Sequence, residues 1–156
     1  MLSWLKSLFK VPQPAGPPEA IKTFTSSDAT ITQDGITIED EGWRIECKAG
    51  KSTVALFEIP DPDLEQCIVT YRARMKGASV TGGAYLEMWC RFPGRGEFFS
   101  KGLHNKIKGT MDWASYEIPF FLKKGQRPDL IKLNLTLEGE GTVWLKDVEL
   151  LKTRLV

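Results

Sequence analysis

DLIKLNLTLEG, residues 129–139, is the most regular stretch of the chain, and it decides the fold class. Its side chains alternate between an apolar set and a polar set, which are Ile131, Leu133, Leu135 and Leu137 against Lys132, Asn134, Thr136 and Glu138. A period of two residues is typical of a β-strand with one buried face and one face in water. The stretch therefore predicts a half-buried strand.

Comparable stretches lie on both sides of it. They are GWRIECK (42–48), STVALFEI (52–59), CIVTYRARMK (67–76), AYLEMWCRF (84–92), GEFFSKG (96–102), SYEIPFF (115–121) and GTVWLKDVELLK (141–152). Short strands separated by turns, with no helical period among them, predict an antiparallel β-sandwich over residues 21–156. Asp34-Gly35, between ATITQ and ITIED, predicts a type I′ hairpin. The apolar phase slips between Leu145 and Val148, which predicts a bulge at Lys146-Asp147.

Residues 1–11 predict a short amphipathic helix, because at ~100° per residue the apolar and polar side chains separate completely. Its apolar face needs a surface, and the contact residues are Leu2, Trp4, Leu5, Leu8 and Phe9. That surface is a lipid interface, a partner subunit or the chain's own sandwich. Protein docking is favoured, since so short a helix buries little area in lipid. The proline-rich segment 12–20 predicts a semi-rigid tether.

Composition excludes several classes of function. The net charge is +1, which argues against nucleic-acid binding. No apolar run is long enough to span a bilayer, and Lys6 and Lys10 interrupt any signal-peptide core. Three dispersed cysteines indicate reduced, buried thiols, and one disulfide with a single free thiol is the alternative. We therefore expect a cytoplasmic protein, peripheral to a membrane if the helix lies on lipid.

Catalytic patterns are scarce. The chain has one histidine, His104, in a loop beside lysines and glycines, and its cysteines lack zinc spacing. The glycine-rich turns carry no phosphate-binding signature. The sequence predicts a protein that is not an enzyme and needs no cofactor or metal.

The C-terminal half resembles the galactose-binding-like jelly roll of carbohydrate-binding modules. The resemblance is carried by GTMDWASYEIPFFL (109–122) with Trp113, by DGITIEDEGWRIEC (34–47) with Trp43, and by the last strand with Gly141, Thr142, Val143, Trp144, Asp147, Val148 and Leu150. It implies a jelly-roll β-sandwich and a binding role. Many relatives have an acidic residue where Lys146 stands, in a region that helps to hold calcium. The lysine argues against a calcium ion here, and Asp147 is interpreted as a bulge carboxylate.

One outward face is unusual, because it interleaves aromatic rings with opposite charges. If the alternating strands share a sheet, its candidate ligand-binding residues are Arg72, Arg74, Tyr85, Glu87, Trp89, Arg91 and Asn134. Aromatic rings stack on sugar C–H faces, and planar polar groups bind pairs of hydroxyls. An ordinary solvated array of charge pairs is the competing interpretation.

Two functions follow from these observations. The first is a non-catalytic module that binds a carbohydrate or another small polar ligand on this face. The alternative is an intracellular interaction or scaffold domain, associated with a membrane surface or a partner through the N-terminal helix.

Overall fold

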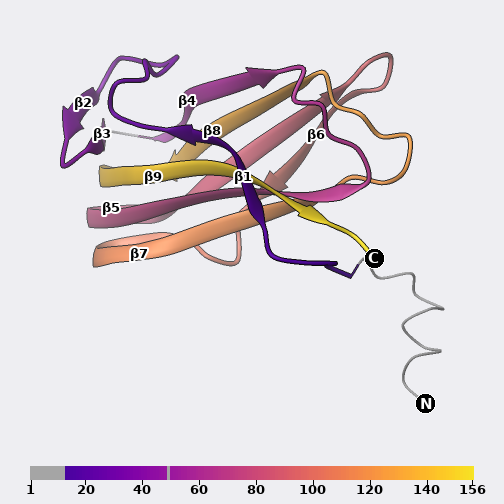
Figure 1. The fold of residues 1–156 in the computed structure, drawn as a ribbon. Coiled ribbons are helices and arrows are strands. Elements are labelled where there is room, and N and C mark those ends of the chain that lie inside the picture. Colours follow the sequence, from indigo (N-terminus) through magenta and orange to yellow (C-terminus); the bar gives the residue numbers. More distant parts are fainter. Residues whose placement is uncertain (1–12, 49) are drawn as a thin grey trace.

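The computed structural model describes residues 13–48 and 50–156, which form nine β-strands (Figure 1). The strands are β1 (Glu19–Phe24), β2 (Ile36–Glu39), β3 (Gly42–Cys47), β4 (Lys51–Pro60), β5 (Cys67–Phe92), β6 (Gly96–Lys101), β7 (Ile107–Phe121), β8 (Leu130–Glu138) and β9 (Gly141–Arg154). Within the described residues no helix is long and apolar enough to cross a membrane. The amphipathic helix predicted for residues 1–11 lies outside the described residues.

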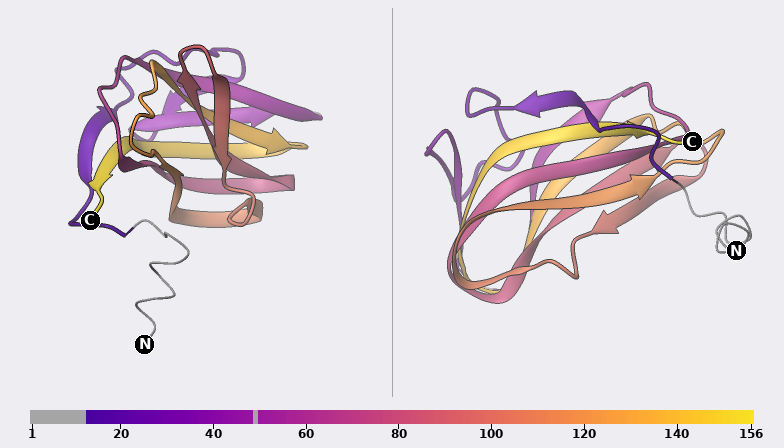
Figure 2. Two further views of the ribbon diagram at one scale, coloured as in Figure 1. Left: turned by 90° about the vertical axis from the view of Figure 1, so that its right-hand side faces the viewer. Right: turned by 60° about the horizontal axis from the view of Figure 1, so that its bottom comes forward.

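The strands form an antiparallel sandwich of two layers, and β5 belongs to both. Residues 67–78 of β5 pair with β9 and β7, while residues 84–92 pair with β8 and β6. The first layer therefore has the order β2-β3-β9-β5-β7, with β1 also on β9, and the second layer has the order β4-β8-β5-β6. Figure 2 shows the strands curving round at the end of the molecule where β5 changes layer.

The change of layer depends on two glycines, Gly82 and Gly83, with φ of 73° and 102°. These values suit glycine, which has no side chain to oppose them. A Cβ on Gly82 would also lie 1.7 Å from the carbonyl oxygen of Glu138. The chain can turn between the layers here because no side chain stands in the way.

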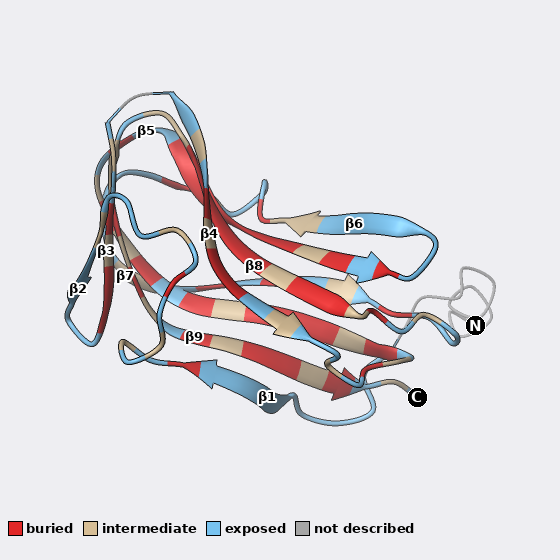
Figure 3. Cartoon of the chain, turned by 90° about the horizontal axis from the view of Figure 1, so that it is seen from above, coloured by how far each residue is buried: buried red, intermediate tan, exposed pale blue. Residues whose placement is uncertain are grey.

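The core lies between the layers and consists mainly of inward side chains from β1, β3, β4, β5, β7, β8 and β9 (Figure 3). The apolar set of β8, which identified the strand in the sequence, is buried. Tyr71 of the first layer reaches across the core, and its hydroxyl donates a hydrogen bond to the carbonyl oxygen of Asn134 at 3.2 Å. Burial, assisted by the nearby Glu87 carboxylate, raises the pKa of this phenol. Cys67 and Cys90 are also buried, and Cys47 is half-buried.

The bulge predicted in the last strand is confirmed. The register of β5 and β9 skips between Arg72↔Glu149 and Arg74↔Lys146, and Asp147 has φ of 52°. Two residues of β9, Asp147 and Val148, thus lie opposite the single residue Ala73 of β5, which returns Val148 to the core face.

The hairpin predicted at Asp34-Gly35 is wrong. The hairpin joins β2 to β3 instead, and its turn residues are Asp40 and Glu41 with φ of 54° and 63°. Positive φ at both central residues is the requirement of a type I′ turn, which these two residues meet without a glycine. The segment before Asp34 leaves the strand pattern to bond to β4, where the amides of Ile31 and Thr32 donate to the carbonyls of Leu56 and Ala55.

The start of the described chain runs along the sandwich. Pro14 forms a bridge with Leu155, and the amide of Ala15 donates to the carbonyl oxygen of Arg154 at 2.7 Å. β1 then begins at Glu19 on the same side of β9.

Candidate functional site

The outward side of the second layer carries five of the seven predicted ligand residues. Directly opposed residues on neighbouring strands share a face. The register opposes Tyr85 to Thr136, Glu87 to Asn134 and Lys101, Trp89 to Lys132 and Phe99, and Arg91 to Glu97. We call this set of ten side chains, from β5, β6 and β8, the second-layer face.

Arg72 and Arg74 do not belong to it, so the prediction of one common surface is wrong for these two residues. They lie on the half of β5 that pairs with β9 and β7 in the first layer. Alternation along the sequence shows that both halves of β5 have an outward side, but the turn at Gly82-Gly83 makes those sides face opposite ways. Arg72 pairs with Glu149 at 3.2 Å, and both arginines line a depression of about 370 Å³ on the first layer.

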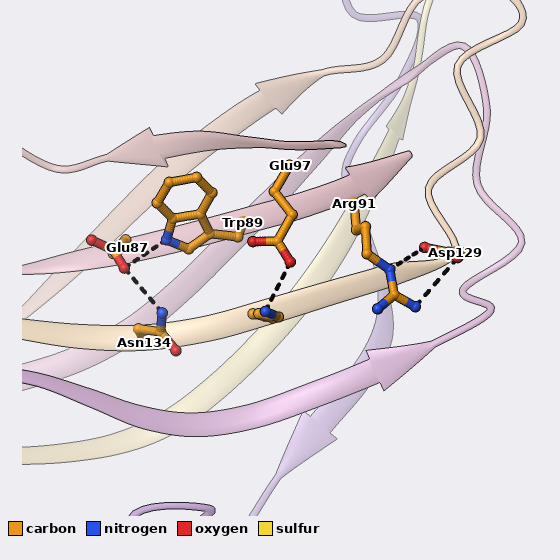
Figure 4. A network of polar contacts seen from close by, with 7 residues as sticks. Glu87, Trp89, Arg91, Glu97, Asp129 and Asn134 are labelled. Atoms are coloured by element: carbon orange, nitrogen blue, oxygen red, sulfur yellow. Dashed lines mark hydrogen bonds and ion pairs between the residues drawn. The ribbon is translucent and has the colours of Figure 1, made fainter. Parts of the chain in front are cut away.

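Glu87 organises the second-layer face, although only 5% of it is exposed. Its Oε1 accepts hydrogen bonds from Nε1 of Trp89 at 2.8 Å and Nδ2 of Asn134 at 3.0 Å (Figure 4). Its Oε2 accepts one from the hydroxyl of Thr136 at 3.4 Å and lies 3.7 Å from Nζ of Lys101. The carboxylate therefore holds the indole and the amide in one orientation, because both donors share one acceptor oxygen.

The face has a polar floor and an aromatic rim. Tyr85, Asn134 and Thr136 point outward, yet they are only 2%, 8% and 0% exposed. Longer neighbouring side chains therefore cover them. Trp89 is half-buried and packs against Phe99 with ring centroids 5.3 Å apart at 59°. Phe99 is 54% exposed and thus offers an apolar surface beside polar groups.

The cations of this face are all neutralised by acids. Lys101 lies near Glu87, Nζ of Lys132 lies 2.8 Å from Glu97, and Arg91 donates two hydrogen bonds to Asp129 at 2.8 Å and 3.3 Å. The hydrogen bond from Arg91 holds the pKa of the Asp129 carboxyl below its ordinary value. Such a face attracts neither anions nor cations strongly, which favours uncharged polar ligands.

Sequence reasoning missed the contribution of β6, namely Glu97, Phe99 and Lys101. A signal was present, since these three alternate in GEFFSKG with a more apolar set. Among the residues that the structure describes, no group of three or more His, Cys, Asp and Glu side chains is placed to hold a metal ion. His104 is exposed, as is Asp147 on its bulge.

Neither a protein-family model nor a curated protein sequence matches this chain. Among solved structures, a family 30 carbohydrate-binding module is 13% identical with a TM-score of 0.53, covering 86% of this chain and 98% of that one. A structure described as a family 4 module (CBM4) is 13% identical with a TM-score of 0.54, covering 83% and 77%. The Stig cyclase Fisc from Fischerella sp. TAU is 13% identical with a TM-score of 0.50, covering 90% and 79%.

Identities this low establish the fold alone. The chain has a galactose-binding-like β-sandwich fold similar to that of these two modules, as the resemblance in the sequence implied.

Proposed function

We propose that the protein is a non-catalytic binding module whose second-layer face takes a neutral carbohydrate or another polyhydroxylated ligand. The observation that carries the proposal is the buried Glu87, which orients Trp89 and Asn134 beside the exposed ring of Phe99. An aromatic ring can stack on the C–H face of a sugar, while the amide oxygen of Asn134 accepts from a hydroxyl. The paired charges of the face suit a ligand without charge of its own.

The shared fold supports binding, but a cyclase also adopts it, so the distinction from an enzyme rests on the side chains. General acid–base chemistry needs a carboxyl group that is able to exchange a proton with the substrate. Both oxygens of Glu87 already face donors of the protein itself. Its role is to position its neighbours, which is a property of a binding surface.

The test measures the affinity of the full chain for neutral β-linked oligosaccharides by glycan array and calorimetry. Trp89→Ala and Phe99→Ala should each weaken binding about fivefold or more, since a stacked ring contributes ~1–3 kcal/mol. Phe121→Ala is the matched control, because Phe121 is 47% exposed on the first layer. Binding that both variants on the second-layer face leave unchanged would refute the proposal.

A further inference from the structure

The outward side of the first layer carries two tryptophans surrounded by cations. Nζ of Lys76 lies 4.7 Å from the ring centre of Trp144 and 5.4 Å from that of Trp113. Nζ of Lys146 lies 4.2 Å from the ring centre of Trp113. Together with Arg74 these side chains form what we call the tryptophan–cation patch, contributed by β5, β7 and β9.

Its positive charge is less well neutralised than that of the opposite face. Arg74 lies directly opposite Lys146 in the register, and like charges in that position repel each other. Neither makes an ion pair with any described residue, and Lys76 has only Asp40 at 4.0 Å. By contrast, Arg91, Lys101 and Lys132 on the second-layer face each have an acidic partner.

The nearby acidic side chains neutralise the charge of Arg72 rather than the charges of the patch. In the register, Arg72 lies opposite both Glu149 and Glu117, and it pairs with Glu149 at 3.2 Å. Asp147, exposed on the bulge, is the one further acid that lines the adjoining depression with Arg74. A bound anion would relieve the repulsion between Arg74 and Lys146.

A second feature of the patch is a buried donor without an acceptor. Nε1 of Trp144 is buried and has no hydrogen-bond partner among the described residues. A buried N–H without an acceptor is unfavourable. A ligand oxygen reaches it only if the surrounding side chains move, because the atom is covered in this structure. Trp144 lies opposite Lys76 in the register, so this donor belongs to the same patch as the unpaired cations.

We propose that the tryptophan–cation patch is a second binding site, which takes the uronic-acid units of an acidic polysaccharide. The carboxylate lies between Arg74 and Lys146, because a guanidinium and an ammonium both donate strongly to carboxylates. The ammonium of Lys146, which lies over Trp113 in the free protein, moves to the carboxylate, and the sugar ring takes its place against the aromatic face of Trp113. This site is independent of the one on the second-layer face.

The experiment titrates the full chain with a tetramer of galacturonic acid, a neutral galactose tetramer and inorganic phosphate, followed by calorimetry and tryptophan fluorescence. The acidic tetramer should bind, and its affinity should fall as salt is raised, because salt screens exposed charges. The double variant Arg74→Gln/Lys146→Gln should weaken it about tenfold or more. Asp147→Asn should strengthen it, since it removes the opposing charge.

Lys124→Gln is the control, because it removes one exposed cation that belongs to neither face and should leave uronate affinity unchanged. Circular dichroism and thermal melting confirm that the double variant is folded. Uronate binding that is absent, or equally tight in the double variant, overturns the proposal. Phosphate or the neutral tetramer binding as tightly as the acidic tetramer overturns the assignment to uronic acids.

Discussion

The side chain of Glu87 points outward from the sheet, yet it is as little exposed to solvent as a core residue. In the sequence it is one polar residue of an alternating strand, with nothing to distinguish it from Glu97 or Glu117. In the structure it accepts hydrogen bonds from three neighbours on two strands. A buried carboxylate is stable only with such partners, so the orientation of Trp89 and the stability of the fold depend on the same atoms.

Glu87→Gln should therefore destabilise the protein. The neutral amide keeps the shape but loses the charge-assisted acceptors and brings an N–H group among donors, which costs about 1–3 kcal/mol. Urea denaturation measures the loss, and the emission of Trp89 should shift as its environment changes. Glu97→Gln is the control, because its ion pair with Lys132 is one-third exposed and contributes ~0–1 kcal/mol. Equal stability of the two variants would argue against Glu87 as the organiser.

The Arg91–Asp129 pair predicts how the stability of the protein depends on pH. The folded state holds the pKa of Asp129 below its ordinary value of 3.8, so the pair's contribution to stability is present above that pH. It is lost as the pH falls through the lower, folded-state pKa. Asp129→Asn should be less stable than the wild type near neutral pH, and the difference should become smaller in strong acid.

Chemical denaturation at the two pH values measures this difference. The exposed Asp34 has no ion pair with any described residue, which makes Asp34→Asn a suitable comparison. A difference between wild type and Asp129→Asn that persists undiminished in acid would contradict the assignment.

At the scale of elements, β5 determines which residues can form a site together. Its two halves carry the same alternation, so their outward residues read as one set along the sequence. The turn at Gly82-Gly83 sends the halves into different layers, and it separates Arg72 and Arg74 from Glu87 and Trp89. One strand thus supplies two faces with different charge.

Gly82→Ala should disturb that turn severely. Gly82 and Gly94 both have φ of +73°, but a Cβ at Gly82 would lie 1.7 Å from the Glu138 carbonyl oxygen, whereas one at Gly94 would meet nothing within 4 Å. Gly94→Ala therefore measures the conformational cost alone, about 1–2 kcal/mol. We expect at least about 3 kcal/mol for Gly82→Ala from thermal or urea unfolding. Equal losses of stability in the two variants would mean that the backbone at Gly82 moves away from the added Cβ without a further loss of free energy.

At the scale of the whole molecule, the two outward faces differ in how their charges are arranged. The second-layer face is polar and internally paired, while the tryptophan–cation patch has cations without partners. The sandwich can therefore present an uncharged ligand surface and an anion-binding surface on opposite sides. Both assignments are proposals, and the variants named for each leave the other face intact.

The N-terminal segment gives the remaining prediction at this scale. The complete separation of apolar and polar residues in 1–11 leads us to expect that it docks on protein, through Leu2, Leu5 and Leu8. If it docks on a partner subunit rather than on the chain's own sandwich, removal of residues 1–12 changes the oligomeric state measured by light scattering. Co-sedimentation with anionic vesicles tests the competing membrane contact. Sedimentation of the full chain alone, with no change in assembly, would favour lipid over protein.

The sequence by itself determined the features that depend on near neighbours. Strict alternation identified the strands because one side of each strand faces the apolar core and the other side faces water. A slip of one residue located the bulge at Asp147 for the same reason, since Val148 must return to the core. The outward set of residues 84–92, together with Asn134, was also visible in the sequence.

Only the tertiary structure decided which outward residues face the same way. Alternation reports the side of a strand but not its layer, and the layer is set by hydrogen bonds between residues far apart in the chain. The separation of Arg72 from Trp89, the choice of Asp40-Glu41 over Asp34-Gly35 as the turn, and the contribution of Phe99 all follow from that pairing. The burial of Glu87 belongs to the same class, because its donors Asn134 and Thr136 are nearly fifty residues away in sequence.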